Sequence, residues 1–100
     1  MIIFSWFNAA EAKRFGTHLA EFFVQNMLPT ASYGDKAFTQ KAEKVLHQMA
    51  GQVLQFKRDH SLNTYQKAQL GNSFKWALRD AKVDPDYTDK LTKWLVVQMG

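Results

Sequence analysis

The segment Val83-Asp84-Pro85-Asp86 constrains the fold more than any other stretch of this sequence. Proline disfavours helical dihedral angles in the residue before it, so a preceding helix has to end near Lys82. Asp84 is a good N-cap and Pro85 suits the first position of a helix, so a second helix begins there. Because the connection is short, the two helices should be neighbours that run roughly antiparallel.

Both helices of this hairpin show the periodicity of an amphipathic helix. Asn63 and Gln66 can form a capping box at the start of the first one. Apolar residues then recur every three or four positions, which predicts helices over about 64–82 and 86–99. The predicted buried residues are Leu70, Phe74, Ala77, Leu78 and Ala81 in the first helix and Tyr87, Leu91, Trp94 and Leu95 in the second.

An earlier helix is predicted over about 8–27, preceded by a possible arm over 1–7. Asn8 and Glu11 have capping-box spacing, and an apolar stripe follows them. Gly16 lies beside this stripe, where a small residue lets another helix come close. The stripe consists of Ala12, Phe15, Leu19, Phe22 and Phe23.

The longest regular stripe predicts a helix over about 36–57, with Asp35 as its cap. A loop with Pro and Gly over 29–34 separates it from the preceding helix. Its apolar residues are Phe38, Ala42, Val45, Leu46, Met49, Val53 and Phe56.

No strand-like alternation, repeat or linker interrupts this pattern. Residues 1–100 are therefore predicted to form one all-α domain of four helices. Its arrangement is either bundle-like or orthogonal, and the sequence does not decide between these two.

The composition excludes several kinds of protein. The chain has no Cys, so disulfides, thiolate metal sites and a cysteine nucleophile are excluded. No apolar run approaches the roughly 20 residues needed to span a membrane. Met1 to Phe7 lacks a basic region and is too short for a signal sequence. We therefore expect a soluble cytoplasmic protein without membrane insertion.

The sequence carries no recognisable catalytic or metal-binding pattern. His18, His47 and His60 lack the spacing of zinc-binding helices, so we expect them to be solvated surface residues. A G-x-S-x-G elbow and a glycine-rich phosphate loop are missing. We predict no enzyme, no cofactor and no catalytic, cofactor-binding or metal residues.

Positive charge concentrates in residues 57–82, whose six basic and two acidic side chains give a local charge of +4, equal to that of the whole chain. On a helical wheel, Lys75, Arg79 and Lys82 flank the apolar face of the predicted helix over 64–82. The aromatic residues Tyr65 and Trp76 lie beyond them. Cations beside exposed rings suit single-stranded nucleic acid, because they meet phosphates and bases respectively.

Burial of these two rings is the alternative that we favour, because large aromatic side chains are more often buried than displayed. Trp76 points about 200° away from Phe74 on a helix, so the two cannot face the same core. We expect Trp76 to contact the first helix, where Phe22 and Phe23 need a large apolar neighbour.

Two hypotheses for the function follow. The first is a non-enzymatic protein–protein interaction or adaptor module that acts as a homodimer or with another protein. It is supported by spare apolar residues, above all the possible oligomer edge at Val96 and Val97, which lies off the buried face of its helix. The second is nucleic-acid binding through the basic and aromatic surface on residues 57–82.

Overall fold

The computed structural model describes the backbone of residues 9–27 and 35–100, and the side chains of the same ranges except those of 35–38. All regular elements in these ranges are helices, which confirms the predicted all-α class. The predicted arm, the loop over 29–34 and the side chain of Phe38 fall outside the described part. The helices are α2 (Ala10–Met27), α3 (Asp35–Asp59), α4 (Thr64–Asp80) and α5 (Pro85–Met99).

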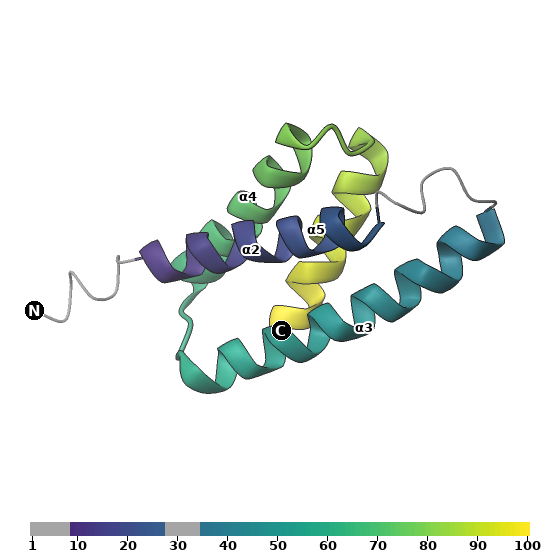
Figure 1. Cartoon of the computed structure of the whole chain (residues 1–100). Coiled ribbons are helices and arrows are strands. Elements are labelled where there is room, and N and C mark those ends of the chain that lie inside the picture. Colours follow the sequence, from purple (N-terminus) through teal and green to yellow (C-terminus); the bar gives the residue numbers. More distant parts are fainter. Residues whose placement is uncertain (1–8, 28–34) are drawn as a thin grey trace, which may run out of the picture.

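The four helices close a ring in which α4 and α5 form the predicted hairpin. α4 packs on α2 and α5, and α3 completes the ring by packing on α2 and α5. Figure 1 shows α2 and α3 running across this hairpin, so the arrangement is closer to an orthogonal domain than to a bundle of aligned helices. None of the described helices has the length and apolar character that crossing a membrane requires.

The hairpin begins and turns at the predicted caps. The Oδ1 atom of Asn63 accepts from the N–H of Gln66 at 2.8 Å, and the N–H of Asn63 donates to Oε1 of Gln66 at 3.0 Å. At the start of α5, the Asp84 carboxylate accepts from the N–H of Tyr87 at 3.1 Å. These bonds satisfy N–H groups that lack partners inside the helices.

α4 ends at Asp80, two residues before the predicted end, because the chain closes the helix with a Schellman motif. The N–H of Val83 donates to the Leu78 carbonyl at 3.1 Å, and that of Lys82 donates to the Arg79 carbonyl at 3.0 Å. This geometry places Lys82 in the left-handed region, with φ of 67°. Glycine usually occupies that position, so Lys82 carries backbone strain.

Gly16 brings α2 and α4 into close contact, as its small size predicts. A Cβ atom built on Gly16 would lie 3.0 Å from Ser73 Cβ and 3.1 Å from the backbone nitrogen of Phe74, and would overlap the carbonyl oxygen of Leu70. The core lies between the four helices. Its fully or almost fully buried side chains include Leu19, Ala20, Phe23, Met27, Val45, Met49, Val53, Leu70, Phe74, Leu78, Leu91, Leu95 and Met99.

Candidate interaction surface

Trp76 lies on the outward side of α4, and 59% of its surface is exposed. The guanidinium carbon of Arg79 is 5.3 Å from the centre of the indole ring, a distance typical of cation–π contacts. The expected burial of Trp76 against the first helix is therefore wrong. The ring instead borders a shallow hollow of about 420 Å³, to which α2 contributes Lys13 and Thr17.

The side of α4 that meets α2 at Gly16 is formed by Leu70, Ser73 and Phe74, and Trp76 lies about 120° around the helix from Leu70. Where the backbones nearly touch, only small side chains such as Ser73 fit between them. Phe23, which was expected to need Trp76, packs instead against Tyr87 of α5, with ring centres 5.8 Å apart.

The predicted basic row on α4 diverges in the structure. Lys75 points to α5, where its Nζ lies 3.7 Å from a carboxylate oxygen of Asp89. Arg79 covers the Trp76 ring, whereas Lys82 belongs to the turn after the helix. Within the predicted set, Arg79 and Trp76 are in contact with each other.

Tyr65 lies three turns before Trp76, on the same side of α4. Its side chain is half-buried, whereas that of Trp76 is mostly exposed. The outward side of α4 thus presents one mostly exposed ring and one half-buried ring.

The predicted apolar edge of α5 faces solvent. Val96 is 56% exposed and Val97 is 74% exposed, although they belong to the same helix as the buried Leu91 and Leu95. They line a surface hollow of about 560 Å³ between α5 and α4. The polar lining residues of this hollow are Lys75, Asp89, Thr92 and Lys93.

A further hollow, of about 620 Å³, lies around the turn of the hairpin, at the end opposite to Val96 and Val97. Its lining combines the apolar side chains of Val83 and Pro85 with Arg79, Lys82 and Asp84. The outward side of the hairpin therefore has apolar groups near both of its ends.

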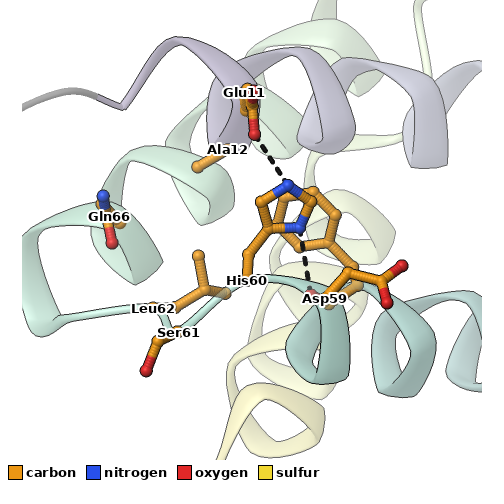
Figure 2. A pocket seen from close by; sticks show the side chains of 8 residues that line it. Glu11, Ala12, Asp59, His60, Ser61, Leu62 and Gln66 are labelled. Carbon is orange, nitrogen blue, oxygen red and sulfur yellow. Dashed lines mark hydrogen bonds and ion pairs between the residues drawn. The ribbon is translucent and has the colours of Figure 1, made fainter. Parts of the chain in front are cut away.

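His60 forms a contact that its position in the sequence did not indicate. Its Nε2 lies 2.7 Å from a carboxylate oxygen of Glu11, its Nδ1 lies 3.3 Å from the carbonyl oxygen of Phe56, and its ring stacks on that of Phe56. Figure 2 shows His60 and Glu11 at the edge of a hollow of about 390 Å³, which Asp59, Ser61 and Gln66 also line. The His60 side chain keeps 39% of its surface exposed, but its contact with Glu11 joins the end of α3 to the start of α2.

This histidine–carboxylate pair does not form a catalytic relay with Ser61. The two ring nitrogens of His60 face Glu11 and the carbonyl oxygen of Phe56, and the structure shows no hydrogen bond from His60 to Ser61 in the part of the chain that it describes. His18 and His47 are exposed, as expected. No cluster of three or more metal-ligating side chains occurs among the residues that the structure describes.

Comparison of the chain with protein-family models, with curated proteins and with solved structures finds no match.

Proposed function

We propose that this chain is a non-enzymatic protein-interaction module, located in the cytoplasm, whose contact surface is the outward side of the α4–α5 hairpin. The observation that carries the proposal is the exposure of Val96 and Val97 side by side on α5, next to a hollow of about 560 Å³. The absence of Cys supports the location, because such a chain needs no oxidising compartment to fold.

Single exposed apolar residues are common on protein surfaces and need no partner to explain them. Here two valines adjoin, and the stems of Lys75 and Lys93 extend the apolar lining beside them. Covering a valine fully is worth about 1.5–3 kcal/mol, so a partner seated here would gain substantially. Trp76 and Arg79 on α4 add two of the three residue types that most often dominate binding energy at interfaces.

A photo-crosslinking amino acid at position 97 tests this function directly in cells that express the protein. A partner seated on the hairpin should yield one adduct of discrete mass, and Val96→Asp should abolish it. The matched control carries the same crosslinker at His47, which is exposed on α3. Absence of a discrete adduct at 97, or an identical adduct from 47, contradicts the proposal.

Nucleic-acid binding is a second candidate function, favoured by one specific observation. Trp76 is accessible and already in contact with the cation of Arg79, as a stacking platform for bases requires. The concentration of positive charge in residues 57–82 supports the same function. The pairing of Lys75 with Asp89 counts against it, because that cation is partly neutralised within the chain.

Trp76→Ala separates stability from binding. Since the ring is mostly exposed, the variant should lose less than about 1 kcal/mol of unfolding free energy in a urea titration. A loss of about 3–5 kcal/mol, typical of a buried Trp, would contradict the outward placement. If the chain binds nucleic acid, its retention on immobilised single-stranded DNA should weaken with salt and fall in Trp76→Ala but not in Val97→Ala. No retention at low salt removes this second candidate.

A further inference from the structure

The outward face of α5 carries its side chains in a regular order along the helix. Two acidic residues, Asp86 and Asp89, come first, and the basic residues Lys90 and Lys93 follow. Val96 and Val97 end the series. All six side chains are exposed, so the order acid, base, apolar runs along one solvent-facing strip.

We propose that this strip pairs with the same strip of a second copy of the chain, with the two α5 helices antiparallel. This inference rests on the proposed function and names its partner. Asp86 and Lys93 are seven residues apart, so they lie on nearly the same side of the helix, two turns from each other. A two-fold axis midway between them places Asp86 of each copy opposite Lys93 of the other, and forms two equivalent ion pairs.

The same register also matches the apolar groups. Val96 and Val97 lie about 10 Å from the midpoint along the helix, and Pro85, at the start of α5, lies about 7 Å from it in the other direction. The valines of one copy therefore reach the level of the other copy's turn hollow, whose apolar lining is Val83 and Pro85. The same register therefore pairs opposite charges and brings the apolar groups of the two copies together.

Other pairings of the two helices fit less well. A parallel pair in register sets Asp86 against Asp86 and Lys93 against Lys93, and like charges facing each other repel. An antiparallel pair centred on Val96 and Val97 buries the valines but leaves the charges of both copies without opposite charges across the interface. Antiparallel packing in the proposed register also aligns the helix dipoles favourably.

The charged groups of Asp86 and Lys93 in one copy are available to pair with those of a second copy. Asp89 already has Lys75 as an ion-pair partner, at 3.7 Å. The structure shows no ion pair for Asp86 or Lys93 within the part of the chain that it describes. The pairing is small, because two 15-residue helices side by side extend only about 22 Å. We therefore expect a weak dimer, with a dissociation constant on the order of 100 µM that rises with salt.

Charge reversal tests the register by sedimentation equilibrium of the purified chain. Asp86→Lys alone and Lys93→Asp alone should each weaken self-association by about tenfold or more, since each sets like charges opposite one another. An equimolar mixture of the two variants should associate again, because both lysines of the first variant then face both aspartates of the second across the interface. The double variant Asp86→Lys with Lys93→Asp should dimerise by itself.

Two exposed charges on α3 provide matched controls. Glu43→Lys and Lys44→Asp make the same charge changes away from α5 and should leave the dimer unchanged. Far-UV circular dichroism establishes that each variant is folded. Lys93→Asp keeps the experiment decisive if Asp86→Lys unfolds, because Lys93 lies in the middle of the helix and has no role at its start.

Three results would overturn the inference: a wild-type chain that stays monomeric at millimolar concentration, single variants that dimerise like the wild type, or a mixture that does not reassociate. If the wild type is monomeric but position 97 crosslinks to a different protein, the proposed function stands and only the self-pairing fails. If no adduct forms at all, the proposed function fails as well.

Discussion

Replacing Gly16 by Ala should destabilise the protein, although alanine is the better helix former. The Cβ atom that alanine adds would overlap the carbonyl oxygen of Leu70 and lie 3.1 Å from the backbone nitrogen of Phe74. Backbone atoms cannot turn aside as a flexible side chain does. The two helices therefore have to move apart, and the packing of Leu70 and Phe74, both fully buried, is disturbed along with them.

The magnitude follows from comparison with Gly51→Ala. Gly51 also lies inside a helix, but a Cβ atom there meets nothing within 4 Å. Both substitutions gain the helix propensity of Ala over Gly, about 1 kcal/mol, so this contribution cancels in their difference. The remaining cost of overpacking at Gly16 should make that variant about 1–3 kcal/mol less stable than Gly51→Ala.

Urea unfolding followed by far-UV circular dichroism measures this difference. With equal m-values, the midpoints report it directly. Gly51→Ala should exceed the wild type in stability by up to about 1 kcal/mol. If Gly16→Ala proves as stable as Gly51→Ala, then α2 and α4 are not in close contact at this position.

Two further variants test local features of the hairpin. Lys82→Gly should stabilise the protein by about 0.5–1 kcal/mol in the same urea assay, because glycine adopts a φ of 67° without the strain that a Cβ atom causes. A loss of stability in this variant would contradict the Schellman geometry. Burial raises the pKa of the Tyr87 hydroxyl above its ordinary value of 10.0, so the folded state holds this proton more tightly than the unfolded state does. The stability that this proton contributes to the folded state is fully present below pH 10 and is lost as the pH rises above 10. Tyr87→Phe should therefore flatten the decline in unfolding free energy above pH 10. An identical decline in both proteins would show that Tyr87 is not buried.

The local structure of this chain could be predicted from sequence because short-range chemistry determines it. The capping box of Asn63 and Gln66 forms both of its hydrogen bonds, and Asp84 caps α5 immediately before Pro85. Each of these features depends on residues within four positions of one another. The apolar stripes were predictable for the same reason, since a period of 3.6 residues identifies the buried side of a helix.

The placement of Trp76 could not be obtained in that way. A helical wheel gives the direction of a side chain but not the distance to the next helix. Gly16 did indicate that another helix comes close, but not that Leu70, Ser73 and Phe74 would be the residues of α4 that meet it. The pairing of His60 with Glu11 gave no signal at all, because it joins residues far apart in the chain.

The two exposed apolar features of the hairpin lie off the packed sides of their helices, and this placement bears on function. Val96 and Val97 are exposed because the inner side of α5 is already filled by residues such as Leu95, so they are surplus to the core. Trp76 is exposed because it lies about 120° around α4 from Leu70, which meets α2 at Gly16. Its ring borders the hollow beside α2 without filling it, so the indole adds little to folding. Its large apolar area gains free energy only when another molecule covers it, which favours a binding role for the outward side of α4.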